Sequence, residues 1–80
     1  MKTVKISLNS IDKVKSFVND ITKFDYDFDL VSGRYVIDAK SIMGIFSVDL
    51  SRDLVLRISS DDAEECKEIR EKLKAFIVED

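Results

Sequence analysis

The spacing of apolar residues switches several times along the chain between a period of two and a period of three to four. A period of two is typical of a strand with one buried face, and the longer period is typical of an amphipathic helix. The strand period covers residues 2–8, 24–30, 34–39 and 54–59, with apolar positions Val4, Ile6, Leu8, Phe24, Tyr26, Phe28, Leu30, Tyr35, Ile37, Ala39, Leu54, Leu56 and Ile58. The helix period covers residues 11–21 and the segment after residue 61, with apolar positions Ile11, Val14, Phe17, Val18, Ile21, Ala63, Cys66, Ile69, Leu73 and Phe76.

Capping residues mark where the helices begin. Ser10 stands directly before the first helical segment and is a good N-cap. Between the two long helical segments, Ser41 is the expected N-cap of a short helix that ends at about Val48. Asp61 with Glu64 has the spacing of a capping box for the last helix. The predicted element order is therefore βαββαβα.

This order predicts an α+β fold, an open-faced sandwich in which a four-stranded antiparallel sheet carries three helices on one face. Ser32-Gly33 is the expected turn between the second and third strands. A two-residue loop there would set Asp27 opposite Asp38, an unfavourable pair of like charges, so a longer loop is the alternative. With no proline, two glycines and no linker, residues 1–80 are predicted to form a single domain.

Composition argues against several classes of function. The formal charge of −3 and the lack of a basic block argue against nucleic acid as a partner. A lone cysteine, Cys66, suits a reducing compartment, and no apolar run reaches the length of a membrane span, so we expect a cytoplasmic protein. The residues Asp25, Asp27 and Asp29 are interpreted as a solvated strand face rather than a metal site.

Enzymatic activity is not expected either. The chain has no histidine and no glycine-rich phosphate loop, so we find no pairing of a nucleophile with a base. Cys66 lies on the apolar stripe of the last helix and is interpreted as a buried hydrophobic residue. The sequence therefore predicts neither a catalytic residue nor a cofactor nor a bound metal.

The segment Lys40–Ser47, with the sequence KSIMGIFS, resembles the regulatory-serine segment of HPr, the small phosphocarrier protein of the bacterial sugar phosphotransferase system. The order and spacing of the elements extend this resemblance over nearly the whole chain. The resemblance implies an HPr-like open-faced β-sandwich.

The loop before the first helix departs from the family pattern. In the phosphocarriers this loop carries a Gly-Leu-His-Ala-Arg-Pro type motif, whose histidine accepts a phosphoryl group from enzyme I. Here Ser10 lies near the histidine position and Asp12 near the arginine position, with about three residues missing before them. A carboxylate would repel a phosphoryl group, and a serine phosphate ester is a poor donor. This chain is therefore not an ordinary histidine phosphocarrier.

The resemblance directs attention to Ser41 instead. In many HPr proteins the matching serine is phosphorylated from ATP by HPr kinase/phosphorylase, and the product binds a catabolite repressor. The catabolite-repression HPr is a histidine-free relative that retains only this regulatory half. By resemblance, Ser41 is the candidate phosphorylation site, and Ile42, Met43 and Phe46 are candidate partner-binding residues. Lys13 or Lys40 could replace the missing arginine as a cation near the phosphate.

Three interpretations remain open from the sequence. The first is a regulatory protein that binds protein partners and is switched at Ser41. The second is a degenerate HPr-fold interaction module in which Ser41 is only a helix cap. The third keeps a phosphotransferase role with Ser10 as an unusual acceptor. Because histidine-free relatives form strand-swapped dimers, the expected states are a monomer or a swapped dimer.

Overall fold

The computed structural model describes residues 2–78. Its elements follow the predicted order βαββαβα. They are β1 (Lys2–Ile6), α1 (Ile11–Ile21), β2 (Phe28–Ser32), β3 (Tyr35–Asp38), α2 (Ile42–Phe46), β4 (Leu54–Ile58) and α3 (Ala63–Lys72).

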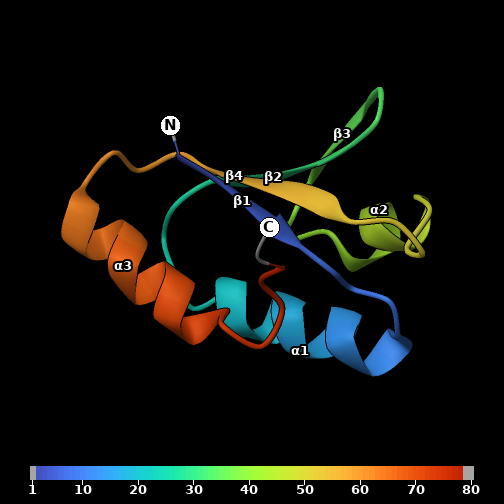
Figure 1. Ribbon diagram of the computed structural model, residues 1–80, viewed down its shortest axis with the longest axis horizontal. Helices are drawn as coiled ribbons and strands as arrows, with labels where there is room; N and C mark the ends of the chain where they lie inside the picture. The colour runs from blue at the N-terminus through green and yellow to red at the C-terminus, as the bar shows by residue number, and fades with distance from the viewer. Residues whose placement is uncertain (1, 79–80) are drawn as a thin grey trace.

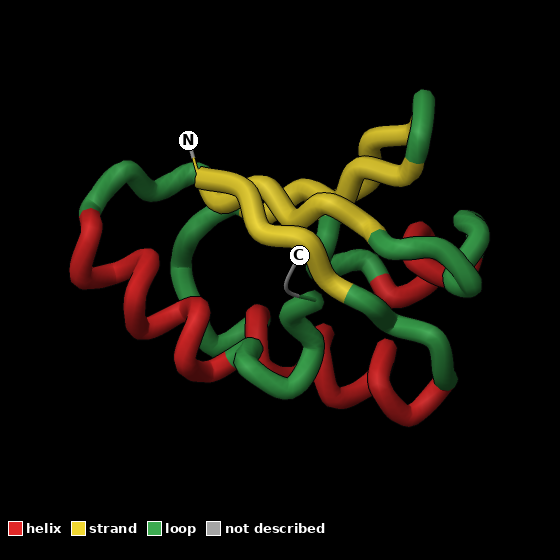
Figure 2. Tube along the Cα trace, in the orientation of Figure 1, coloured by secondary structure: helices red, strands yellow, loops and turns green. Residues whose placement is uncertain are grey.

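The strands form one antiparallel sheet in the order β1-β4-β2-β3. The helices α1 and α3 lie beneath this sheet, and α2 lies at its end near the start of α1 (Figure 1). Figure 2 shows all three helices, in red, on the same side of the yellow strands. The predicted α+β open-faced sandwich with helices on one face is confirmed.

The core lies between the sheet and the two long helices. The central strand β4 buries its three alternating residues Leu54, Leu56 and Ile58, as its period predicts. Phe17 of α1 meets Phe76 edge to face, with ring centroids 5.7 Å apart and an interplanar angle of 87°. This geometry is a preferred arrangement of aromatic rings, so it helps to fix how the chain after α3 packs on α1.

The chain after α3 covers part of the β1 edge. The Ser7 N–H donates to the Phe76 carbonyl at 2.8 Å, and the Val78 N–H donates to the Lys5 carbonyl at 2.9 Å. Ile77 forms a bridge with Ile6. These bonds satisfy backbone groups that an edge strand would otherwise leave open.

The segment before β2 is a loop and not the predicted strand. β2 begins at Phe28, while Phe24 and Tyr26 lie half-buried in the preceding loop. The Asp27 N–H donates to Ser59 Oγ at 3.1 Å, and the Ser59 N–H donates to the Asp27 carbonyl at 3.1 Å. The alternation of aromatic and acidic residues here therefore reflects one-sided packing of a loop. The three aspartates do not share one strand face.

The turn between β2 and β3 lies one residue later than predicted. Ser32 pairs with Tyr35, so the loop consists of Gly33 and Arg34. Gly33 has a φ of 56°, which glycine adopts without the steric cost of a side chain. The two-residue length is correct, but the Ser32-Gly33 position is wrong.

The shifted turn changes which carboxylates face each other. Asp29, rather than Asp27, is the partner of Asp38. Asp29 accepts a hydrogen bond from Arg57 Nη2 at 3.3 Å, while Asp38 Oδ1 accepts from the Lys40 N–H at 2.9 Å. Each carboxylate thus has its own donor, which offsets the repulsion that the sequence suggested.

Three residues assigned to apolar faces are exposed instead. Ile11 is 62% exposed because it begins α1 beyond the edge of the core, and Tyr35 is 70% exposed at the projecting end of the hairpin. Ala63 is also exposed, at the first turn of α3.

The cap of α3 is Asp62 and not Asp61. Asp62 Oδ1 accepts hydrogen bonds from the N–H groups of Glu64 and Glu65, at 2.9 and 3.1 Å. Two adjacent aspartates are equally good caps by residue type, so the choice depends on where the helix starts.

Candidate functional site

Ser41 caps α2, as predicted. Its backbone is extended, with φ −94° and ψ 102°, and its Oγ accepts a hydrogen bond from the Gly44 N–H at 3.2 Å. The Ser41 N–H donates to the Asp38 carbonyl at 3.0 Å, which closes the turn between β3 and α2. The residue is exposed, so its hydroxyl is accessible from solvent.

Gly44 leaves space beside the Ser41 hydroxyl. A Cβ atom at Gly44 would lie 3.2 Å from Ser41 Oγ and 3.7 Å from the Cβ of Ile37. The first distance is below ordinary van der Waals contact. The role of Gly44 was not predicted from the sequence, although its position three residues after a cap is the signal that would have identified it.

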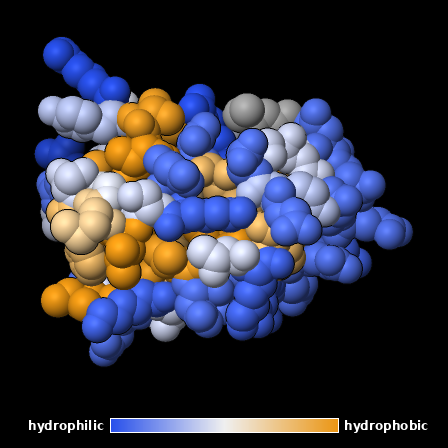
Figure 3. Space-filling view, turned by 180° about the vertical axis from the view of Figure 1, so that it is seen from behind, coloured by the Kyte–Doolittle hydropathy of each residue, from blue (hydrophilic) through white to orange (hydrophobic). Residues whose placement is uncertain are grey.

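The short helix α2 presents part of its apolar surface to solvent. Ile45 is completely buried and anchors the helix on the core, and Ile42 is half-buried. Met43 is 75% exposed and Phe46 is 40% exposed. We call these two residues the α2 surface. Seen from behind, apolar side chains in orange gather over the end of the molecule that carries α2, and the opposite end is blue (Figure 3).

Lys40 does not point at Ser41. Its Nζ donates a hydrogen bond to the carbonyl oxygen of Phe24 at 2.7 Å and lies 5.6 Å from the centre of the Phe28 ring. These contacts hold the ammonium against the loop before β2. Of the two lysines considered as replacements for the missing arginine, Lys40 is therefore already engaged elsewhere, while Lys13 lies in the first turn of α1.

Ser10 caps α1 in the same way. Its Oγ accepts from the Lys13 N–H at 3.1 Å, and the residue is exposed. Asp12 lies in the first turn, where a carboxylate favours the helix dipole. The geometry accounts for Ser10 as a structural cap.

Cys66 is 6% exposed, in agreement with its expected burial. Its Sγ donates to the Ser60 carbonyl at 3.3 Å.

Among residues 2–78, no three metal-ligating side chains come together in a way that could hold an ion. Within the same range, no helix combines the length and hydropathy needed to cross a bilayer.

Two pKa shifts lie away from the serine caps. A hydrogen bond to the Glu65 carboxylate, followed by burial, raises the pKa of Tyr26 to about 12. Hydrogen bonds from the side chain and backbone of Ser51 lower the pKa of Asp49, with a smaller contribution from the Arg52 charge. Tyr26 lies in the loop before β2, and Asp49 lies in the loop between α2 and β4.

Comparison with known proteins gives a family match. A family model described as "PTS HPr component phosphorylation site" matches residues 13–79. No curated protein sequence matches the chain. Several solved structures do.

Two of these structures have similar sequences over most of their length. HPr-C-His from Thermoanaerobacter tengcongensis is 29% identical, with 91% of this chain and 90% of that chain covered and a TM-score of 0.70. The phosphocarrier protein HPr from Bacillus anthracis is 28% identical, with 96% and 94% covered and a TM-score of 0.69.

A third structure shares the fold at lower identity. It is the catabolite repression protein Crh from Bacillus subtilis, at 24% identity, with 95% of this chain and 90% of that chain covered and a TM-score of 0.61. That protein is described as an intertwined, swapped dimer.

Proposed function

The chain belongs to the HPr family, and from this membership we propose that it is a regulatory, protein-binding member switched by phosphorylation of Ser41. The observation that carries the proposal is that the exposed residue Ser41 caps the short helix that carries the α2 surface. A change of charge at Ser41 would therefore alter a surface that already presents apolar side chains to a partner.

The absence of histidine from the sequence supports a regulatory role over a carrier role. A phosphorylated imidazole is a labile donor, whereas a serine phosphate is a stable ester that suits a switch. Ser10, near the family's histidine position, is engaged as a helix cap. Its neighbour Asp12 would oppose an incoming phosphoryl group.

The chemistry of the switch is a simple transfer. The γ-phosphoryl group of ATP moves to Ser41 Oγ, the hydroxyl proton is released, and ADP leaves. The product carries nearly two negative charges beside the Gly44 N–H, which is a suitable hydrogen-bond donor. The cap geometry already exists, so the fold does not need to change.

The new anion would be close in sequence to Met43 and Phe46. The phosphate and these two side chains would together form a surface that combines negative charge with apolar area. We propose HPr kinase/phosphorylase as the phosphoryl donor and a catabolite repressor as the protein that reads the product. The expected setting is the cytoplasm, and the expected state is a monomer or a strand-swapped dimer. Neither nucleic acid nor a membrane is expected as a direct partner.

A second candidate is an HPr-fold interaction module without a phosphoryl role. The position of Lys40 favours it, because this ammonium is held by Phe24 and leaves Ser41 without the cation nearest in sequence. Under this alternative, Met43 and Phe46 still bind a partner, but Ser41 is only a cap.

Binding to a repressor separates the two candidates. The protein is treated with HPr kinase/phosphorylase and ATP, and its affinity for a catabolite repressor is measured by calorimetry with and without treatment. The switch predicts tighter binding after treatment, and it predicts that Met43→Ser weakens this binding. Equal affinity of the phosphorylated and untreated proteins would favour the module.

A further inference from the structure

A cavity lies at the end of the molecule opposite α2, between α3 and the strands β1 and β4. It has a volume of about 390 Å³, which is within the range of small-molecule sites. Its walls combine apolar side chains with three basic residues and one acidic residue. They are Lys2, Thr3, Val4, Ile58, Ala63, Cys66, Lys67, Arg70 and Glu71.

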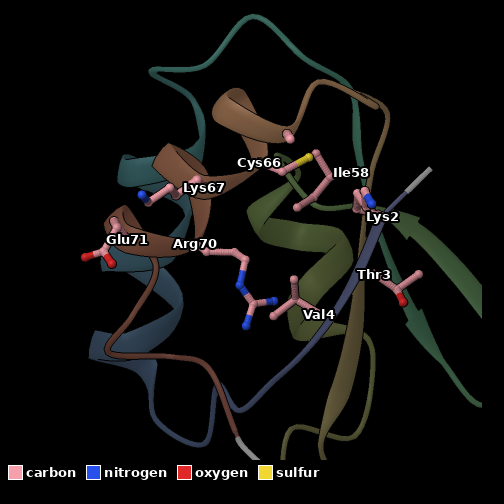
Figure 4. A pocket seen from close by; sticks show the side chains of 9 residues that line it. Lys2, Thr3, Val4, Ile58, Cys66, Lys67, Arg70 and Glu71 are labelled. Carbon is pink, nitrogen blue, oxygen red and sulfur yellow. The ribbon is translucent and has the colours of Figure 1, made fainter.

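The apolar part of the wall comes from all three elements. Val4 and Ile58 face the cavity from the strands, and the Cys66 side chain points from α3 toward Ile58 (Figure 4). Ile58 is completely buried, whereas Val4 and Cys66 keep 7% and 6% of their surface exposed and the nearby Ala63 is exposed, so these three residues carry the apolar surface that solvent reaches. A ligand with a short hydrocarbon body would bury this remaining apolar area.

Arg70 supplies the charge that faces this wall. Its guanidinium extends from α3 toward Val4, whereas Lys67 and Glu71 point away from the strands (Figure 4). Lys2 lies close enough to the Asp61 carboxylate for their charges to attract each other. Among the described residues, no carboxylate lies within ion-pair distance of the Arg70 guanidinium. Because Arg70 has no carboxylate partner within residues 2–78 and lies beside apolar side chains, it is available for an anion.

We propose that this cavity binds a small amphipathic anion, a carboxylate with a short aliphatic body. The planar guanidinium of Arg70 can donate two parallel hydrogen bonds to one carboxylate. The hydrocarbon would lie against Val4, Ala63 and Cys66. An inorganic phosphate would satisfy the charge but would leave the apolar wall uncovered. The site is separate from Ser41 and does not depend on the phosphorylation proposal.

The test is a titration of the ¹⁵N-labelled full chain followed by two-dimensional NMR. Hexanoate is the probe, and acetate, inorganic phosphate and 1-hexanol are compared with it at equal ionic strength. Saturable shifts are expected at Thr3, Val4 and Cys66 with hexanoate, and not at Gly44. Acetate and hexanol should each bind about tenfold more weakly, because each lacks one of the two contributions.

Two variants test the assignment without disturbing the core. Arg70→Gln should weaken hexanoate binding about tenfold, while the matched variant Arg34→Gln, at the exposed hairpin turn, should leave it unchanged. Ala63→Leu fills the rim of the cavity from an exposed helical position and should abolish binding. Equal shifts with phosphate and hexanoate, no saturable shifts at all, or unaltered binding by Arg70→Gln would each overturn the proposal.

Discussion

The ammonium group of Lys40 donates a hydrogen bond of 2.7 Å to the carbonyl oxygen of Phe24, sixteen positions earlier in the chain. This bond connects the turn before α2 to the loop before β2. The same ammonium lies 5.6 Å from the centre of the Phe28 ring. Lys40, adjacent in sequence to the candidate phosphorylation site, is therefore a structural residue.

Replacing Lys40 by methionine should lower the free energy of unfolding by about 1–2 kcal/mol, since a partly buried charged hydrogen bond and a cation–π contact are lost. Urea denaturation followed by circular dichroism measures this. Lys23→Met, at an exposed position of the loop before β2, should change stability by less than about 0.5 kcal/mol. Equal effects of the two substitutions would contradict the structural role of Lys40.

Replacing Gly44 by alanine should slow phosphorylation of Ser41 by roughly five- to tenfold, because the new Cβ would lie 3.2 Å from the hydroxyl oxygen. Initial rates with HPr kinase/phosphorylase and ATP provide the measurement. Ser47→Ala, at the other end of α2, is the control and should leave the rate unchanged. A Gly44→Ala rate equal to that of the unaltered protein would show that space at this position is unimportant.

Ser10→Ala should cost about 1 kcal/mol of stability, as expected for the loss of a helix cap. The comparison is Ser16→Ala in the interior of α1, which favours the helix and should not destabilise the protein.

With enzyme I and phosphoenolpyruvate, the unaltered protein should acquire no phosphate. A label that depends on Ser10 would revive its role as an acceptor.

Tyr26 should ionise at about pH 12, which is measurable from tyrosinate absorbance in a Tyr35→Phe background where Tyr26 is the remaining tyrosine. Because the folded pKa is raised above the ordinary tyrosine value of 10.0, the associated stability is fully present below about pH 10. It is lost as the pH rises through about 12. Glu65→Gln should remove most of the shift, and an unchanged titration in that variant would exclude the Tyr26–Glu65 hydrogen bond as its cause.

The sequence correctly predicts the elements in which regularly spaced apolar residues are buried in the core. The buried residues of β4 and α1 and the caps Ser10 and Ser41 belong to this class, because period and capping are local properties. The segment of residues 24–27 has the alternation of a strand, yet it forms a loop. The alternation of apolar and polar residues is the same in a hydrogen-bonded strand and in a loop that packs one side against the core, so it cannot distinguish the two.

The candidate site was predictable only in its local part. Ser41 as a cap follows from residue type and position, whereas the exposure of Met43 and the burial of Ile45 depend on how α2 is set against the core. The engagement of Lys40 with Phe24 joins two distant segments and has no local signature. The cavity beside Arg70 likewise requires β1 and α3 to be placed relative to each other.

The intact mass of the protein after incubation with HPr kinase/phosphorylase and ATP is the most direct measurement, with HPr itself as a positive control and Ser41→Ala in parallel. We predict the addition of one phosphate to the unaltered protein and none to the variant. An unchanged mass, under conditions that phosphorylate HPr, would contradict the proposed switch and leave Ser41 as the cap of α2.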